Sequence, residues 1–134
     1  MLEVRHLNVW YGAAQALFDV SLQVGGGERV VLQGLNGAGK STLLQAIMGM
    51  SQHATGTICY QNKNIERWEP YRRARAGLGY VAEDRRLFTG LTVRENLRLA
   101  ARGNASAREA QALQLFPALA TMLDRPSGRM SGGE

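Results

Sequence analysis

The stretch "VVLQGLNGAGKSTLLQAIMGM", residues 30–50, decides the fold because an apolar run, a glycine-rich loop and an apolar-periodic segment follow one another without interruption. Glycine loses more backbone entropy on folding than any other residue, so a glycine cluster at one junction needs a reason beyond a turn. Residues 34–41 fit the pattern G-x-x-x-x-G-K-[ST], whose backbone amides surround a phosphate group. We therefore expect a phosphate-binding loop between a strand and a helix.

The residues of this loop have separate tasks. Gly34, Gly37 and Gly39 let backbone amides turn inward around the β- and γ-phosphates. The helix that we expect to begin near Lys40 adds the positive end of its dipole. Lys40 would bridge phosphate oxygens as a compact point charge, and the Ser41 hydroxyl would ligate Mg²⁺.

The segments around the loop predict strands. Residues 18–24 alternate apolar and polar side chains, as in a half-buried strand, and residues 2–9 suggest an earlier strand that pairs with it. The apolar members of the alternating segment are Phe18, Val20, Leu22 and Val24. Residues 29–33 form a continuous apolar run typical of a buried parallel strand, and residues 78–83 are a further candidate. Residues 56–65 predict a hairpin around Asn62 and Lys63.

Helical patterns follow the loop and fill the last third of the chain. The apolar positions expected on one face of the first helix are Leu43, Leu44, Ile47 and Met48, with Gly49 as its stop. Pro70 and Gly77 bracket a short helix. Two hydroxyl–carboxylate pairs match the capping box at a helix start, and they predict helices over residues 93–102 and 107–116. These pairs are Thr92 with Glu95 and Ser106 with Glu109, and Pro117 is expected to open one more short helix.

Composition limits the function classes. The 134 residues are 45% hydrophobic and 20% charged, as in one globular domain, and the net charge of +5 suits nucleic acid, a membrane surface or a nucleotide. The N-terminal residues do not resemble a signal peptide and no apolar run is long enough to cross a bilayer, so we expect a cytoplasmic chain. Cys59 is the only cysteine, which excludes an internal disulfide and a cysteine metal cluster. His6 and His53 are expected at the surface.

Three segments together resemble a known family. They are "GLNGAGKST" at 34–42, "GYVAEDRRLFTGLTVRENL" at 79–97 and "MSGGE" at 130–134. The chain looks like the ATP-binding subunits of ABC transporters, most like those of branched-chain amino acid importers, and the last segment matches the family signature that usually reads L-S-G-G-Q. The resemblance covers essentially the whole chain. It implies an α/β P-loop NTPase of ABC type, with an antiparallel β subdomain, a parallel-sheet core and a helical subdomain from about residue 87.

The resemblance also implies roles for particular residues. Tyr11 would stack on adenine, unless Tyr11 or Trp10 simply packs at a strand end. Glu83 stands where most of the family has a glutamine that meets Mg²⁺ and the attacking water, and would be catalytic with Lys40 and ligate the metal with Ser41; a solvated charge beside Asp84 is the alternative. The implied nucleotide site comprises Tyr11, Gly34, Asn36, Gly37, Ala38, Gly39, Lys40, Ser41, Thr42, Ser131, Gly132 and Gly133.

Two neighbours of Glu83 depart from the branched-chain pattern, since Ala82 and Asp84 replace a proline and a glycine that are usual in this subgroup. The family's Walker B aspartate, catalytic glutamate and switch histidine have no counterpart here. Residues 1–134 are therefore expected to be an incomplete nucleotide-binding domain, truncated before the Walker B strand, that binds ATP without hydrolysing it.

The implied function is that of an energy-coupling subunit on the inner face of the cell membrane, working with ATP and Mg²⁺ for branched-chain amino acids or a similar small solute. Its implied partners are permease subunits and a second ATP-binding subunit arranged head to tail, and no nucleic acid is expected. The alternative is a soluble ABC-type ATPase acting on nucleic acid or ribosomes. The arginine-rich residues 67–86, with Tyr71 and Tyr80 among them, half satisfy a nucleic-acid surface.

Overall fold

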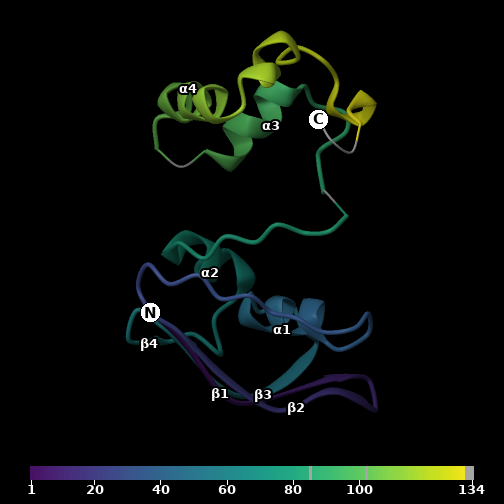
Figure 1. The fold of residues 1–134 in the computed structure, drawn as a ribbon, viewed down its shortest axis with the longest axis vertical. Helices are drawn as coiled ribbons and strands as arrows, with labels where there is room; N and C mark the ends of the chain where they lie inside the picture. The colour runs from purple at the N-terminus through teal and green to yellow at the C-terminus, as the bar shows by residue number, and fades with distance from the viewer. Residues whose placement is uncertain (85, 102, 132–134) are drawn as a thin grey trace. The chain divides into compact units, whose positions relative to one another are not determined.

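The computed structural model describes residues 1–84, 86–101 and 103–131. They form two compact units, Met1–Tyr80 and Val81–Glu134. The first unit contains β1 (Leu2–Tyr11), β2 (Ala14–Val24), α1 (Lys40–Ile47), β3 (His53–Tyr60), β4 (Lys63–Asn64) and α2 (Pro70–Ala76) (Figure 1). The second unit contains α3 (Val93–Ala100), α4 (Ala105–Leu115) and the 3₁₀ turns η1 (Pro117–Thr121) and η2 (Ser127–Arg129).

The first unit is built on a four-stranded sheet with the order β2-β1-β3-β4, in which all pairs are antiparallel. The expected pairing of residues 2–9 with 18–24 is confirmed. Helix α1 lies over one face of this sheet (Figure 1). The buried side chains between them are Val4, Leu7, Val9, Leu17, Ile58 and Ile65, together with Leu43, Ala46 and Ile47 of α1. This small core sets the position of the glycine-rich loop, which leads directly into α1.

Two bulges in the β1–β2 pair change which side chains face the core. His6 and Asp19 have φ values of 51° and 50°, and the register shifts on both sides of the Leu7–Val20 pair. The imidazole Nδ1 of His6 lies 2.7 Å from Oδ1 of Asp19, so this contact connects the two bulges. Leu17 consequently points inward, while Phe18 is 68% exposed. The expectation that Phe18 shares the buried face is therefore wrong.

The hairpin of β3 and β4 turns one residue earlier than predicted. Tyr60 pairs with Lys63, and the two residues between them, Gln61 and Asn62, have φ values of 49° and 61°. Two consecutive left-handed residues are the mark of a type I′ turn, whose twist matches that of the strands. The predicted hairpin is confirmed, with Lys63 in the strand rather than in the turn.

Helix α1 begins and ends where the sequence predicts, since Lys40 is its first residue and Gly49, with φ of 74°, follows its C-cap Met48. Its buried face consists of Leu43, Ala46 and Ile47. Leu44 is 46% exposed, so its expected burial is wrong. Positions 43, 46 and 47 share one face by the i, i+3, i+4 spacing, and Leu44 lies one position outside it.

The predicted parallel strand over residues 29–33 and the further strand candidate over 78–83 do not form in the part of the chain that the structure describes. Val30 and Val31 of the first segment are 54% and 77% exposed. The four strands of the sheet pair only with one another, so no strand is paired with either segment among the described residues. A strand without a partner leaves its N–H and C=O groups unpaired, and the apolar run alone cannot supply a ladder.

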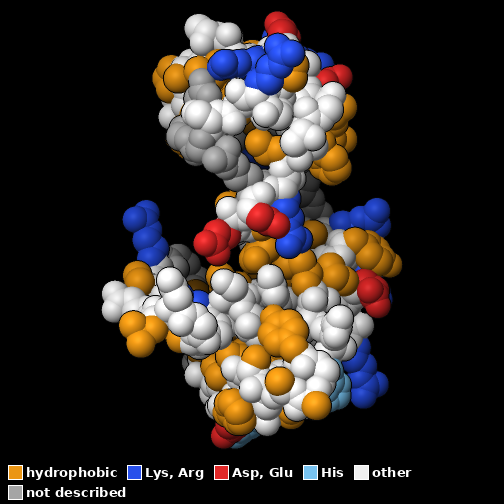
Figure 2. Space-filling model, turned by 90° about the vertical axis from the view of Figure 1, so that its right-hand side faces the viewer, with side chains coloured by type: hydrophobic (Ala, Val, Ile, Leu, Met, Phe, Trp, Pro, Cys, Tyr) orange, Lys and Arg blue, Asp and Glu red, His pale blue; other side chains and the backbone are white. Residues whose placement is uncertain are grey.

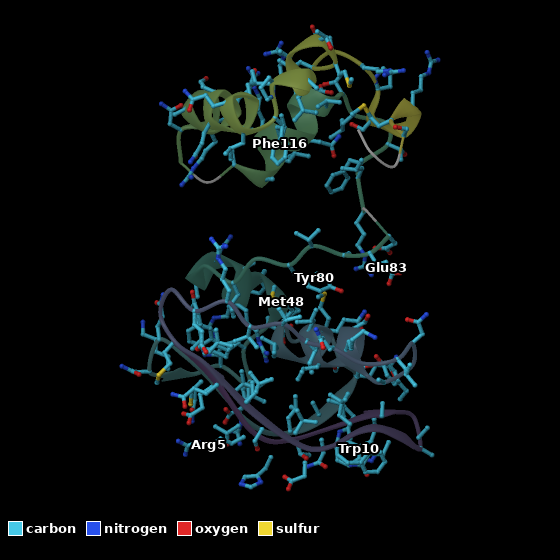
Figure 3. All side chains as sticks on the ribbon, in the orientation of Figure 1. Arg5, Trp10, Met48, Tyr80, Glu83 and Phe116 are labelled. Atoms are coloured by element: carbon cyan, nitrogen blue, oxygen red, sulfur yellow. The ribbon has the colours of Figure 1, made fainter. Side chains whose placement is uncertain are left out.

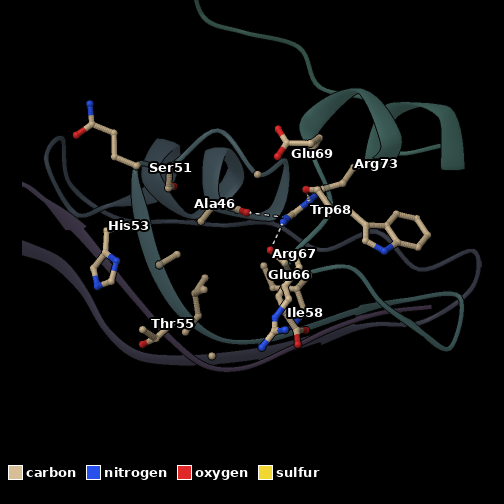
Figure 4. A pocket seen from close by; sticks show the side chains of 15 residues that line it. Ala46, Ser51, His53, Thr55, Ile58, Glu66, Arg67, Trp68, Glu69 and Arg73 are labelled. Carbon is tan, nitrogen blue, oxygen red and sulfur yellow. Dashed lines mark hydrogen bonds between the residues drawn. The ribbon is translucent and has the colours of Figure 1, made fainter.

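Helix α2 matches its prediction, with Pro70 in the first turn and Gly77 as the C-cap. Its central residue Arg73 is buried, with 2% of its surface exposed, so this arginine is not part of a solvated face. Its guanidinium donates to four backbone carbonyl oxygens: those of Ala46 (3.0 Å), Ile47 (2.7 Å), Glu66 (2.8 Å) and Trp68 (2.9 Å). Figure 4 shows Arg73 between Ala46 and Glu66. Helix α2 is thereby tied to the C-terminal end of α1.

The surroundings of Arg73 fit the guanidinium closely. A Cβ on Gly49 would lie 2.8 Å from its Nε, and the left-handed φ of Gly49 also excludes most side chains. A cavity of about 330 Å³ opens beside it, lined by the carboxylates of Glu66 and Glu69 among others. Burial lowers the pKa of Arg73, while those two carboxylates raise it. Arginine is not deprotonated in proteins, so Arg73 places a permanent positive charge at the C-terminal end of α1.

The second unit starts its first helix with the predicted capping box. The hydroxyl of Thr92 accepts from the backbone N–H of Glu95, whose carboxylate accepts from the Thr92 N–H. These hydrogen bonds lower the pKa of Glu95. Helix α3 ends at Ala100, since Ala101 is its C-cap; residue 102, at the predicted end, lies outside the described residues.

The capping box predicted at Ser106 is wrong. Asn104 caps α4 instead, because its side-chain oxygen accepts from the N–H of Ala107. Glu109 accepts hydrogen bonds from Arg94 and Arg98 of α3, and this ion pairing leaves it unavailable for a cap. The short helix predicted at Pro117 is confirmed as the 3₁₀ turn η1.

We predict that Arg73→Met lowers the free energy of unfolding by about 3 kcal/mol, because four buried carbonyl oxygens lose their donor. Urea denaturation of the chain, followed by circular dichroism, measures this loss. The matched control is Arg72→Met, which removes an exposed arginine of the same helix with its contact to the Trp68 ring and should cost no more than about 1 kcal/mol. Equal effects of the two substitutions would contradict the role assigned to Arg73.

Candidate nucleotide-binding site

The glycine-rich loop depends on glycine for two measurable reasons. Gly37 and Gly39 have φ values of 85° and 88°, in the left-handed region that other residues rarely adopt. A Cβ on Gly39 would also lie 2.6 Å from Cδ2 of Leu17, a buried side chain of β2. Gly39 therefore brings the start of α1 against the sheet. The motif predicts these glycines, but the contact with Leu17 is visible only in the structure.

The N-terminus of α1 is open to an anion. The N–H of Leu43 bonds to the carbonyl oxygen of Gly39 at 2.9 Å, but the amides of the first three helical residues, Lys40–Thr42, precede any intrahelical acceptor. No side chain caps this end, and its first turn contains no acidic residue. Unpaired amides and the positive end of the helix dipole point the same way, and both attract negative charge.

Lys40 folds back over the loop. Its Nζ donates to the carbonyl oxygens of Gly34 and Leu35, each at 2.8 Å. An ammonium has three donors, so one is still available for an oxygen outside the loop. The ammonium of Lys40 thus lies at the loop, and the first amides of α1 follow that loop directly. Ser41, the next residue, is exposed in the first turn, where its hydroxyl oxygen is a suitable ligand for a hard cation.

Two aromatic residues at the end of β1 behave differently. The ring of Trp10, labelled in Figure 3, packs against that of His53, and the two ring centroids lie 4.9 Å apart. Tyr11 is 47% exposed, and its hydroxyl lies 3.3 Å from both Oγ1 of Thr42 and Oε1 of Gln45 on α1. Of the two aromatic residues, Tyr11 is thus the one that contacts α1. Gln45 was not predicted from the sequence, although it lies one helical turn after Ser41.

Asn36 and Ala38 lie exposed within the loop, where the N–H of Ala38 donates to the carbonyl oxygen of Leu35 at 3.1 Å. The other predicted site residues, Glu83 and residues 131–133, belong to the second unit. Glu83 lies in an exposed turn (Figure 3), and its neighbour Asp84 is ion-paired with Arg86 at 3.0 Å. Ser131 is described, whereas Gly132 and Gly133 lie outside the described residues. The approach of these residues to a nucleotide stays a prediction, as does the adenine contact of Tyr11.

Other candidate centres are limited within the residues that the structure describes. No group of three or more histidine, cysteine, aspartate or glutamate side chains could hold a metal ion there. His6 and His53 lie at the surface, as expected. In this part of the chain, no helix has the length and hydrophobicity to span a bilayer. The glycine-rich loop is thus the site with the clearest chemistry.

Comparisons with known proteins agree with this geometry. Residues 17–134 match the family model described as ABC transporter. The chain is 39% identical over 138 residues to the high-affinity branched-chain amino acid transport ATP-binding protein BraG of Pseudomonas aeruginosa, covering 100% of this chain and 59% of that protein. It is 34% identical to the probable branched-chain amino acid transport ATP-binding protein LivF of Archaeoglobus fulgidus, covering 100% of this chain and 58% of that protein.

A solved structure titled as an ATP-binding subunit of an ABC transporter superposes with a TM-score of 0.84 at 33% identity, over 99% of this chain and 57% of that one. The likeness confirms the predicted fold class. The chain thus spans a little under three fifths of the length of the two curated relatives and of this structure.

We predict that Lys40→Ala lowers the affinity for Mg-ATP at least tenfold, roughly, because the phosphate charge loses a charge-assisted hydrogen bond. Isothermal titration calorimetry on the folded variant measures this. Lys63→Ala is the matched control, since it removes the chain's other lysine, an exposed residue of β4, and should leave the affinity unchanged. A Lys40→Ala variant that binds ATP as tightly as the control would refute the loop assignment.

Proposed function

The chain belongs to the ABC transporter family, and from that membership we propose that it forms the ATP-binding part of an energy-coupling importer subunit. The observation that carries the proposal is the loop from Gly34 to Ser41, which joins left-handed glycines, a folded-back lysine and an uncapped helix start. We propose branched-chain amino acids or a similar small solute as the cargo, because the names of BraG and LivF specify branched-chain amino acid transport.

The loop binds ATP through its phosphates in this proposal. The amides at the start of α1 donate to phosphate oxygens, and Lys40 exchanges its loop carbonyls for the β- and γ-phosphates. Tyr11 lies beside α1 with almost half of its surface exposed, so it offers a ring face to adenine. Stacking tolerates different bases, which suits a site whose affinity comes mainly from phosphate.

Mg²⁺ fits the oxygen donors available, namely the Ser41 hydroxyl, the Glu83 carboxylate and the phosphates themselves. When bound, the ion neutralises charge that develops on the phosphates during transfer. Glu83 would orient the attacking water.

The second unit offers a surface for a membrane partner. A groove of about 630 Å³ opens there beside α3, lined largely by apolar side chains that include Val81, Leu87, Phe88 and Leu99. Phe88 is 62% exposed and Leu99 61%. Hydrophobic side chains are visible at the surface of this unit (Figure 2). An exposed apolar groove of this kind is typical of a protein-binding site. We propose that a cytoplasmic segment of a permease docks in it.

The chain would then lie against the inner face of the cell membrane. It would pair head to tail with a second ATP-binding subunit, and its residues 131–133 would face the nucleotide bound by that second subunit. The alternative, a soluble ABC-type ATPase on nucleic acid or ribosomes, has less support, because BraG and LivF are named as transport proteins.

We predict that the whole protein co-purifies with an integral membrane protein and that Phe88→Asp weakens this association at least tenfold, roughly, since a carboxylate would have to be buried in the groove. Phe18→Asp is the matched control, because Phe18 is exposed to a similar extent on β2. Quantitative pull-down from detergent-solubilised membranes tests this. Retention of RNA or DNA through high salt, with no membrane protein, would favour the alternative function.

Glu83→Gln in the whole protein should leave ATP affinity nearly unchanged but shift the Mg²⁺ dependence of ATP hydrolysis, because an amide replaces a charged metal ligand. Asp84→Asn provides the comparison, since it neutralises the adjacent carboxylate, which is paired with Arg86. Hydrolysis is measured against Mg²⁺ concentration in the presence of the permease. Superimposable curves for wild type and both variants would make Glu83 a bystander.

A further inference from the structure

Two side chains of α1 contact the far end of the Tyr11 side chain. Tyr11 is the last residue of β1, next to the hairpin turn at Gly12, which has a φ of 59°. Its phenolic hydroxyl lies 3.3 Å from Oε1 of Gln45 and 3.3 Å from Oγ1 of Thr42. Thr42 and Gln45 are three positions apart in α1, so both lie on the same face of the helix. A residue at the end of a hairpin is thereby connected to the helix that follows the phosphate loop.

The contact at the hydroxyl decides where an exposed ring lies. Tyr11 is 47% exposed, so packing against the core does not immobilise its side chain. A tyrosine side chain has two rotatable bonds, and its hydroxyl lies on the axis of the second one, χ2. A hydrogen bond at the hydroxyl therefore fixes χ1, the torsion that places the ring. With χ1 fixed, the ring stays beside the N-terminal half of α1.

Of the two acceptors, Gln45 is the one that a nucleotide leaves to Tyr11. Thr42 is itself predicted to belong to the nucleotide site, and a hydroxyl that turns towards a ligand changes its geometry to Tyr11. The side-chain carbonyl oxygen of Gln45 only accepts hydrogen bonds, so it cannot donate to a phosphate. Gln45 also lies one helical turn beyond Ser41, farther from the loop. Its contact with the Tyr11 hydroxyl is thus compatible with the empty and the occupied site.

We propose that Gln45 is a positioning residue for the nucleotide base, because it holds the Tyr11 ring where adenine stacks. The inference rests on the proposed function, in which Tyr11 provides that stacking face. A side chain that is already ordered loses less conformational entropy when a ligand binds to it. Gln45 consequently raises the affinity for the base without touching it, while the loop and Lys40 bind the phosphates.

A purely structural role is the alternative for this contact. The same hydrogen bond joins β1 to α1, so its loss could instead displace the start of the helix. A displaced helix start would weaken the binding of every phosphate ligand, inorganic triphosphate included. Loss of the positioning role affects only ligands that carry a base. The comparison of ATP with inorganic triphosphate therefore separates the two roles.

Isothermal titration calorimetry of the full chain with Mg²⁺ and either ATP or inorganic triphosphate tests the proposal, and circular dichroism checks that each variant is folded. Gln45→Met keeps the length and helix propensity of the side chain but removes the acceptor. It should weaken ATP binding about fivefold, the cost of ordering one side chain, and leave triphosphate binding unchanged. Gln114→Met, the same substitution at an exposed position of α4, is the matched control and should change neither affinity.

Gln45→Glu is the conservative variant, since its carboxylate retains an oxygen acceptor for the Tyr11 hydroxyl. The added negative charge repels ATP and triphosphate alike. The ratio of the two affinities should therefore equal that of the wild type, even where both affinities fall. A ratio as low as that of Gln45→Met would overturn the proposal, because the acceptor would then be irrelevant.

A double-mutant cycle with Tyr11→Phe identifies the residue through which Gln45 acts. Tyr11→Phe keeps the ring but removes the hydroxyl, so it should lose at least as much ATP affinity as Gln45→Met. Because the Phe ring has no contact left for Gln45 to make, the double variant should bind ATP as weakly as Tyr11→Phe alone. A further loss in the double variant, equal to that of Gln45→Met alone, would overturn the proposal.

Two more results would overturn the positioning role: an unchanged ATP affinity in Gln45→Met, or an equal loss of ATP and triphosphate affinity in that variant. A wild-type chain that binds triphosphate as tightly as ATP would refute the adenine contact of the proposed function, and this inference with it. A wild-type chain that prefers ATP, with a Gln45→Met variant that prefers it equally, would overturn the role of Gln45 alone.

Discussion

The buried guanidinium of Arg73 fixes the helix on which the phosphate loop depends. Its four hydrogen bonds to carbonyl oxygens join the C-terminal end of α1, the segment before α2 and α2 itself. A helix whose N-terminus must receive an anion cannot be secured there by a side-chain cap, because the cap would occupy the amides that bind the ligand. Anchoring at the other end leaves those amides available. The eight-residue helix α1 is therefore anchored at its C-terminal end, while its N-terminal end is left to bind the anion.

The electrostatics of the two ends are complementary. Arg73 places a permanent positive charge against the negative end of the helix dipole. At the start, Gly39 approaches Leu17 so closely that a side chain would collide with it, and the first turn carries no carboxylate. The positive end of the dipole consequently faces the loop without a competing negative group. A phosphate that arrives there meets amides, dipole and the ammonium of Lys40 together.

Local sequence rules succeeded where a few neighbouring residues decide the structure. The loop motif, the start of α1 at Lys40 and the capping box of Thr92 with Glu95 follow from such rules. They failed where distant partners decide. Phe18 turns outward because a bulge intervenes at Asp19, and residues 29–33 find no strand to pair with among the described residues. Arg73 looked like one of many surface arginines, since its acceptors on α1 are 26 and 27 positions away. Of the candidate site, the loop was predictable, whereas its support by Leu17 and Arg73 was not.

The central claim is that the start of α1 binds the phosphates of a nucleotide, and amide chemical shifts test it most directly. Two-dimensional ¹H–¹⁵N NMR of the chain, titrated with Mg-ADP, reports on each backbone N–H separately. The account predicts that the largest saturable shifts occur at Gly37, Gly39, Lys40 and Ser41, with smaller changes at Tyr11 beside α1. The account would be contradicted if, at saturating nucleotide, the chemical shifts of these loop amides did not change while those of amides elsewhere in the chain did.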